Sequence, residues 1–195
     1  MTIRPTYTSD WFTPWIPIWT KHVIPRFVGI PRIRWLEVGS YEGRSALWAL
    51  DNFLTGEGST ITCIDLWSPA VRDVEDRFDA NVAGRLNLVK CKGLSRDVLP
   101  TLSKESFHGI YIDGSHDKDE VLCDAELALP LLRPGALLIF DDYEYGPCRW
   151  SDFLNPEEVR QPVFGVREAV DTFLDRRSEE FEVLHRGWQL FLRRR

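Results

Sequence analysis

The sequence predicts an α/β fold in which a doubly wound, seven-stranded sheet alternates with helices and ends in a reversed strand. From residue 33 onwards, short apolar runs alternate with longer amphipathic stretches, a pattern typical of a parallel sheet built from βαβ units. Two final apolar runs separated by Arg186-Gly187 predict an antiparallel hairpin. The 195 residues suit a single domain, and a hydrophobic content of 44% is enough for a continuous core.

Each strand is predicted from a short apolar run, and each helix from apolar residues that recur every three to four positions. The helix that follows the first strand, for example, carries Ala46, Leu47, Leu50, Phe53 and Leu54 on one stripe. Five strands are expected at residues 33–38, 60–65, 86–91, 107–113 and 136–141, and the hairpin at 181–185 and 188–192. The helices are expected at 44–54, at 71–83, around Val121, Ala125, Ala128 and Leu132 with an end near Pro130 to Gly135, and around Val166 to Leu174.

Residues 1–32 differ from the rest and are expected to form an N-terminal arm, with the main domain at residues 33–195. Aromatic and aliphatic residues recur here at helical spacing, but four prolines interrupt them, so a short, kinked helical segment is expected. Two interpretations remain open: an arm packed on the domain or on a second subunit of a homodimer, and a lid over a substrate. The aromatic residues concerned are Trp11, Phe12, Trp15 and Trp19, and Trp150 is a further candidate for an aromatic surface near the pocket or for a core or dimer contact.

Charge and composition exclude several classes of partner. The net charge of −6 has the wrong sign for a protein that binds mainly nucleic acid or acidic lipid. No apolar run approaches the roughly 20 residues of a membrane helix, and the N-terminus has no signal-peptide pattern. The four cysteines, Cys63, Cys91, Cys123 and Cys148, have no metal-binding spacing and are expected to be reduced. We therefore expect a cytoplasmic protein.

A glycine-rich turn after the first strand and an acidic residue after the second predict a nucleoside ligand. Gly39 and Gly43 allow a ligand to approach the backbone, and the following helix N-terminus favours an anionic group. Asp65 lies 26 residues after Gly39, where a carboxylate can accept hydrogen bonds from ribose hydroxyls. The alternative for Asp65 is that it caps the next turn.

Three carboxylates and a histidine follow the fourth and fifth strands. Asp113, Asp141 and Asp142 would repel one another at adjacent strand ends, and a divalent cation such as Mg²⁺ would relieve this repulsion. His116 is the best-placed general base, since imidazole titrates near neutral pH. The alternatives are that Asp141 caps a turn, that Asp142 is solvated and that His116 has no function.

These motifs together resemble those of class I S-adenosylmethionine-dependent methyltransferases. Within that class, the motifs resemble the small metal-dependent O-methyltransferases of the macrolide-sugar methyltransferase and cephalosporin hydroxylase-like group. They resemble catechol O-methyltransferases more distantly. It implies a Rossmann-like sheet in a three-layer αβα arrangement. The motifs that carry it are WLEVGSYEGRS at 35–45, CID at 63–65, YIDGSH at 111–116, LRPG at 132–135 and FDDY at 140–143.

The resemblance also implies roles for individual residues. The cofactor S-adenosylmethionine would be held by the loop after the first strand and by residues after the next strands. His116 and Asp113 would be catalytic, and Asp113, Asp141 and Asp142 would bind Mg²⁺ or another divalent cation. The residue after Asp141 is Asp142, whereas these relatives have Asn at that position. This difference makes the implied metal site more negative. The implied cofactor-binding residues are Glu37, Gly39, Ser40, Tyr41, Gly43, Ser45, Asp65, Trp67, Ser95, Arg96 and Asp113.

The expected reaction is therefore transfer of a methyl group to a hydroxyl of a small molecule such as a sugar, polyol or phenol. A metal and a base would lower the pKa of that hydroxyl, and binding would place it in line with the methyl group. Three alternatives remain: a metal-independent methyltransferase with His116 as the sole base, a non-catalytic nucleoside-binding protein, and an iron oxygenase. The oxygenase is disfavoured because Lys118 stands where an acidic ligand two residues after His116 would be needed.

Overall fold

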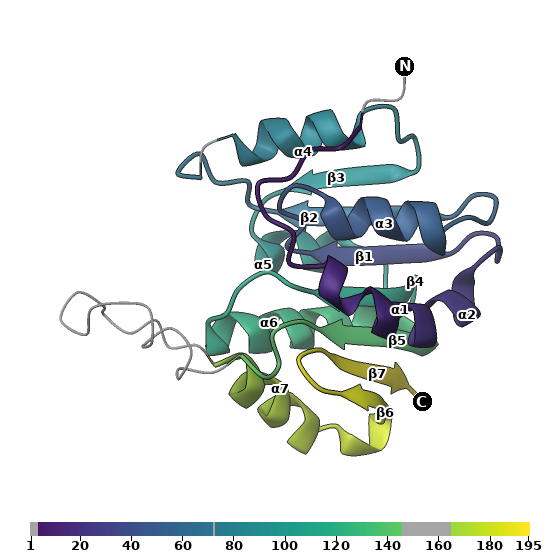
Figure 1. Cartoon of the computed structure of the whole chain (residues 1–195). Coiled ribbons are helices and arrows are strands. Elements are labelled where there is room, and N and C mark those ends of the chain that lie inside the picture. Colours follow the sequence, from purple (N-terminus) through teal and green to yellow (C-terminus); the bar gives the residue numbers. More distant parts are fainter. Residues whose placement is uncertain (1–3, 72, 146–164) are drawn as a thin grey trace. The chain divides into compact units, whose positions relative to one another are not determined.

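The computed structural model describes residues 4–71, 73–145 and 165–195 (Figure 1). Cys148 and Trp150, which the sequence analysis singled out, lie outside these ranges. By its internal contacts the chain divides into two compact units, residues 1–98 and residues 99–195. Each unit is described by itself.

The first unit is a parallel three-stranded sheet with helices, preceded by short helical turns. The strands lie in the order β3-β2-β1. Val38 at the end of β1 pairs with Ile64, one residue before the end of β2, so the loops that follow these two strands begin side by side. The elements are η1 (Thr13–Trp15), α1 (Ile16–His22), α2 (Ile24–Phe27), β1 (Arg34–Val38), α3 (Arg44–Asn52), β2 (Thr60–Asp65), α4 (Val74–Val82), β3 (Leu88–Lys92) and α5 (Ser95–Val98).

The core of the first unit joins the N-terminal helical turns to the strands through aromatic rings. Trp19 of α1 is 1% exposed, and its ring lies 5.9 Å from that of Trp35 on β1. Phe53, which follows α3, packs edge-on against Trp35 at 4.9 Å. Aromatic pairs of this kind contribute beyond their buried area. The segment from Phe12 to Phe27 is therefore part of this unit's core, and its helices are short and interrupted by prolines, as predicted.

In the described part of the second unit, residues 99–145 and 165–195, four strands lie in the order β4-β5-β7-β6. Strands β4 and β5 are parallel, whereas β7 runs antiparallel to both of its neighbours. Helix α6 packs against α7 and β4. The elements are η2 (Leu99–Thr101), β4 (Phe107–Ile112), α6 (Lys118–Ala128), η3 (Leu129–Leu131), β5 (Leu132–Phe140), α7 (Val166–Asp175), η4 (Ser178–Glu180), β6 (Phe181–Arg186) and β7 (Leu190–Arg194).

The predicted fold class is confirmed: the seven strands are those of a Rossmann-like α/β sheet with a reversed last strand. Several boundaries differ, most clearly that of β5, which begins at Leu132 instead of at residue 136. Leu132 was expected on the apolar face of a helix, but it begins β5 and pairs with Phe107. The helix ends earlier because Pro130 lies in the 3-10 turn η3, where a proline without an N–H group cannot continue the α-helical hydrogen bonds.

Two further expectations concern the environment of the protein. Within the described ranges, no helix has the length and apolar character that crossing a membrane requires. Among the described residues, Cys63, Cys91 and Cys123 form no disulfide, in keeping with the expectation of reduced cysteines.

Candidate active site

The loop between β1 and α3 is shaped by residues with positive φ. Gly39 and Gly43 have φ of 85° and 81°, which glycine adopts without steric cost. Tyr41 between them has φ of 46°, a conformation that an L-residue holds only when its surroundings fix it. The loop ends at Gly43, which gives the N-terminus of α3 no side-chain cap. The first N–H groups of α3 are thus suited to an anionic group such as a carboxylate.

Asp65, at the end of β2, fastens this loop. Its Oδ2 atom accepts hydrogen bonds from the backbone N–H groups of Ser40 at 2.9 Å and Tyr41 at 2.8 Å. Its Oδ1 atom accepts one from the N–H of Trp67 at 2.8 Å, so Asp65 also caps the next turn. A carboxylate offers about four lone-pair sites, and three of them are used here. Asp65 can therefore hold the loop and still accept a ligand hydroxyl.

Glu37 is a buried carboxyl group behind the same loop. It is 1% exposed, and its Oε1 atom accepts a short hydrogen bond from the hydroxyl of Ser45 on α3. The pKa of Glu37 is raised to about 7, mainly by burial; the hydrogen bond from Ser45 lowers it and the nearby charge of Asp65 raises it. A positively charged ligand group beside Glu37 would favour its ionised form.

The remaining residues implied for the cofactor lie at the ends of β2 and β3. Trp67 is buried and packs on Phe78 of α4, with ring centroids 4.5 Å apart, and its indole N–H donates to the backbone oxygen of Tyr41 at 2.9 Å. Ser95 and Arg96 begin α5, where Ser95 is half-buried and Arg96 exposed. The structure thus joins Trp67 to the loop by a hydrogen bond, whereas no such bond links Ser95 or Arg96 to it among the described residues.

The donors and acceptors of the first unit fit S-adenosylmethionine. An uncapped helix start suits its carboxylate, the buried Glu37 suits a cationic group, and Asp65 keeps acceptor capacity for a ribose hydroxyl. A Cβ at Gly43 would come within 3.2 Å of the Phe78 ring, so the turn also needs a residue without a side chain at that position.

In the second unit, a tyrosine hydroxyl lies between two of the predicted metal ligands. Tyr111 of β4 is 1% exposed, and its hydroxyl contacts Asp141 Oδ2 in a short hydrogen bond and Asp113 Oδ2 at 3.1 Å. The side-chain amide of Gln189 donates to the same hydroxyl at 3.4 Å. Burial, followed by the charge of Asp142, raises the pKa of Asp141 to about 6.

Asp142 points to a different set of partners. Its Oδ2 atom lies 2.8 Å from Nε2 of His116, and its Oδ1 atom accepts a hydrogen bond from the indole of Trp188 at 2.9 Å. Tyr145 packs on the His116 ring at 5.1 Å and edge-on against Trp188 at 5.8 Å. His116 thus lies among aromatic rings and is paired with a carboxylate, which rules out the interpretation of Asp142 as merely solvated.

The position of His116 follows from the helix behind it. Asp117 caps α6 by accepting hydrogen bonds from the N–H groups of Asp119 and Glu120, at 2.9 and 3.2 Å. His116 therefore stands on the loop immediately before the helix and is 36% exposed. A half-exposed imidazole that is paired with a carboxylate can exchange protons with a bound ligand.

In the part of the chain that the structure describes, the three predicted metal ligands are not gathered into one cluster. Among the described residues, no group of three or more His, Cys, Asp or Glu side chains is arranged to hold a metal ion. The physical reason is visible in the contacts, because Tyr111 joins Asp113 to Asp141 while both oxygens of Asp142 face His116 and Trp188. We therefore derive no step of the reaction through a metal.

Residues 36–143 match a family model described as a methyltransferase domain, which is more than half of the chain. The chain belongs to the methyltransferase-domain family. It is 30% identical over 143 residues to a protein of Mycobacteroides abscessus named "Putative O-methyltransferase". That match covers 72% of the chain and 61% of the relative, so this methyltransferase-domain chain spans about three fifths of the relative's length.

Two solved structures share the fold. An O-methyltransferase from Bacillus cereus in complex with S-adenosylhomocysteine is 18% identical, with a TM-score of 0.61 over 100% of this chain and 94% of that chain. The MycE methyltransferase from the mycinamycin biosynthetic pathway, in complex with Mg, S-adenosylhomocysteine and mycinamycin VI, is 19% identical. Its TM-score is 0.61 over 97% of this chain and 50% of that chain. At these identities the likeness shows the fold alone.

In this methyltransferase-domain chain, several residues that contact the candidate site residues were not predicted from the sequence. Tyr111 had a detectable signal, because a tyrosine inside an apolar strand needs a partner for its hydroxyl. Trp188 and Gln189 had no sequence signal of a role at the site beyond their place in the predicted hairpin. Thr8 and Glu42 had no signal either, since their contact joins segments 34 residues apart.

Proposed function

We propose that this chain transfers a methyl group from S-adenosylmethionine to a hydroxyl group of a small molecule. Family membership and the donors of the β1–α3 loop support the cofactor assignment. The observation that carries the assignment to a hydroxyl acceptor is the pairing of His116 with Asp142, because an oxygen nucleophile must lose a proton during transfer. Both sets of residues follow carboxyl ends of strands, where ligands bind in open α/β sheets.

The proposed roles of the cofactor-binding residues follow from their charge and position. When bound, the cofactor supplies an electrophilic methyl group on a sulfonium centre. Glu37 would balance positive charge on the ligand, and the uncapped start of α3 would receive its carboxylate. Asp65 would accept hydrogen bonds from the ribose while it keeps the loop in place.

The proposed chemistry at the acceptor is proton removal by His116. As the acceptor oxygen takes up the methyl group, its hydroxyl would give its proton to the imidazole of His116. Asp142 stabilises the resulting imidazolium, because a carboxylate at 2.8 Å favours the charged ring. The pairing also fixes the direction of the ring, so the base is already oriented when the acceptor arrives.

The acceptor class is proposed from the surroundings of His116. The ring of Tyr145 packs on His116, and Trp188 packs edge-on against Tyr145, so an aromatic surface borders the base. Such a surface suits a phenol or the apolar face of a sugar. The described cysteines Cys63 and Cys91 form no disulfide, which is compatible with the reducing cytoplasm, where we place the reaction.

The proposal is tested by incubating the protein with S-adenosylmethionine carrying a labelled methyl group and a panel of phenols, sugars and polyols. We expect label in at least one acceptor, with one equivalent of S-adenosylhomocysteine formed per methyl ether. Cofactor binding without turnover on any hydroxyl acceptor would instead support a non-catalytic nucleoside-binding protein.

A further inference from the structure

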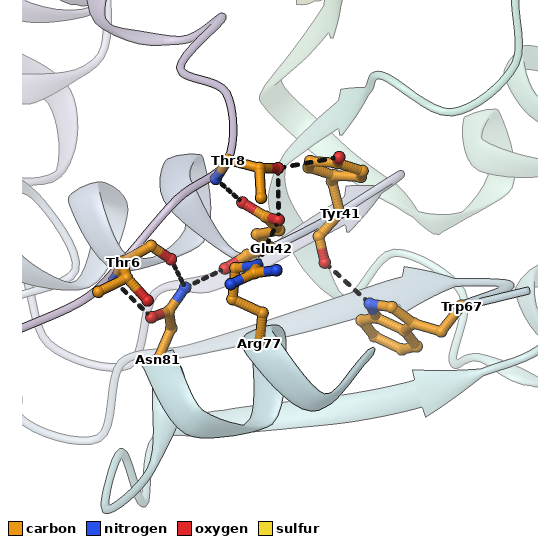
Figure 2. A network of polar contacts seen from close by, with 7 residues as sticks. All are labelled: Thr6, Thr8, Tyr41, Glu42, Trp67, Arg77 and Asn81. Atoms are coloured by element: carbon orange, nitrogen blue, oxygen red, sulfur yellow. Dashed lines mark hydrogen bonds and ion pairs between the residues drawn. The ribbon is translucent and has the colours of Figure 1, made fainter. Parts of the chain in front are cut away.

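We propose that Glu42 is a positioning residue that fastens residues 4–12, here called the strap, onto the cofactor loop, and that the strap and the cofactor bind cooperatively. This inference rests on the proposed cofactor and goes beyond it, because Glu42 and the strap themselves need not touch the ligand. Figure 2 shows the contacts that carry it.

Glu42 is a buried carboxylate that holds three donors. It is 1% exposed and lies in the loop between Gly39 and Gly43. It accepts hydrogen bonds from the backbone N–H and the hydroxyl of Thr8, both at 2.7 Å, and from Nε of Arg77 on α4 at 2.7 Å. Burying a carboxylate is costly unless it is paired and hydrogen-bonded. The strap thus supplies two of the contacts that make this burial tolerable.

A second attachment lies at Thr6, two residues before Thr8. The side-chain amide of Asn81 accepts from the N–H of Thr6 at 2.8 Å and donates to the Thr6 carbonyl at 2.9 Å. The same amide nitrogen donates to the backbone oxygen of Glu42 at 2.9 Å. Asn81 therefore couples the strap to the loop backbone as well as to α4.

The strap reaches the proposed cofactor site through Tyr41. The Tyr41 hydroxyl lies 3.3 Å from Thr8 Oγ1, and Tyr41 must be the donor because the hydroxyl proton of Thr8 goes to Glu42. Trp11 of the strap packs on the Tyr41 ring at 5.2 Å, although Trp11 itself is 66% exposed. The strained backbone of Tyr41 is held from the other side by Asp65 and Trp67.

Every polar group of Tyr41 is therefore engaged, either by the strap or by residues proposed to hold the cofactor. Thr8 takes its hydroxyl, Asp65 its N–H group and Trp67 its carbonyl. Coupling between two binding events is reciprocal. If the docked strap raises the affinity for the cofactor by stabilising this arrangement of the loop, the bound cofactor must therefore favour strap docking by the same factor.

The test compares Thr8→Val with Thr8→Ser. Valine removes both hydroxyl contacts but keeps the shape and the backbone N–H, whereas serine keeps the hydroxyl. The matched control is Thr172→Val on α7, which also removes a donated hydroxyl bond, here to the carbonyl of Glu168 at 2.7 Å. The dissociation constant of S-adenosylhomocysteine is measured by calorimetry, and the Tm is measured without ligand.

We expect Thr8→Val to raise the dissociation constant about fivefold, the scale of one or two lost hydrogen bonds. Thr8→Ser and Thr172→Val should match the parent protein. A second measurement needs no variant: S-adenosylhomocysteine should slow hydrogen exchange at the Thr8 amide of the parent several-fold.

The outcomes separate this inference from the function on which it rests. If the parent binds the ligand but Thr8→Val only lowers the Tm, or if exchange at Thr8 does not change on binding, the strap has a purely structural role and the inference is wrong. If the parent does not bind S-adenosylhomocysteine at all, the cofactor assignment falls, and the inference falls with it.

Discussion

The carboxylate of Asp142 lies 2.8 Å from Nε2 of His116, and this contact joins the loop after β5 to the loop before α6. Asp142 has φ of 54°, an uncommon conformation for a residue other than glycine. The backbone therefore holds a strained residue at the point where its side chain meets the proposed base. Strain of this kind is found at functional sites, where the surrounding structure over-determines it.

The first prediction concerns the removal of the proposed base. His116→Ala should lower turnover about 10²- to 10⁴-fold, the range for loss of a positioned general base, and should leave the affinity for S-adenosylhomocysteine within about twofold. Steady-state kinetics and calorimetry measure the two quantities. His108→Ala serves as the control, because His108 is a half-buried histidine that contacts Arg133. Near-parent turnover of His116→Ala would show that the histidine is structural.

The second prediction concerns metal dependence. Turnover should stay within about twofold after treatment with a chelator, because Tyr111 joins Asp113 to Asp141, and Asp142 is engaged by His116 and Trp188. Rates are compared before and after chelation and after Mg²⁺ is added back. Loss of turnover that Mg²⁺ restores would contradict this expectation and support the magnesium site at Asp113, Asp141 and Asp142 that the sequence indicates.

The third prediction uses the buried carboxyl of Glu37. Its pKa rises from 4.5 to about 7 on folding, so the unfolded chain loses the proton first as the pH increases. The contribution of this pKa difference to the free energy of unfolding is fully present below about pH 4.5, and it is lost as the pH rises through about 7. A shift of this size corresponds to about 3 kcal/mol.

Urea unfolding of the ligand-free parent and of Glu37→Gln between pH 4 and 8 measures this effect. The free energy of unfolding of the parent should fall relative to the variant across that window and level off above about pH 7. Taking the difference removes the titration of groups common to both proteins. A difference that does not change with pH would show that Glu37 ionises normally.

The sequence predicts local features of this fold more completely than its long-range contacts. The bounds of β2 are predicted to the residue, and α3 begins at Arg44 as expected because Gly43 with its positive φ ends the loop. Leu132 was misplaced because apolar periodicity cannot tell that it pairs with Phe107 on a strand.

The same distinction applies to the candidate site. Asp65 and His116 could be selected because each ends or follows a predicted strand, and strand ends are where ligands bind. Glu37 was indicated only by the family resemblance. The bridge made by Tyr111 and the contact of Thr8 with Glu42 depend on side-chain directions and on packing between distant segments. Strand and helix periodicity carries no information about either.

The central claim is that the first unit binds an S-adenosyl ligand through the β1–α3 loop and Asp65. Calorimetric titration with S-adenosylhomocysteine tests it most directly, using the parent, Asp65→Ala, and Asp51→Ala as a control that removes an exposed carboxylate from α3. The account predicts saturable one-to-one binding by the parent and by Asp51→Ala, and at least a tenfold weaker affinity for Asp65→Ala, since both the ribose contact and the loop anchor are lost. No binding by the folded parent, or equal affinity for all three proteins, would contradict it.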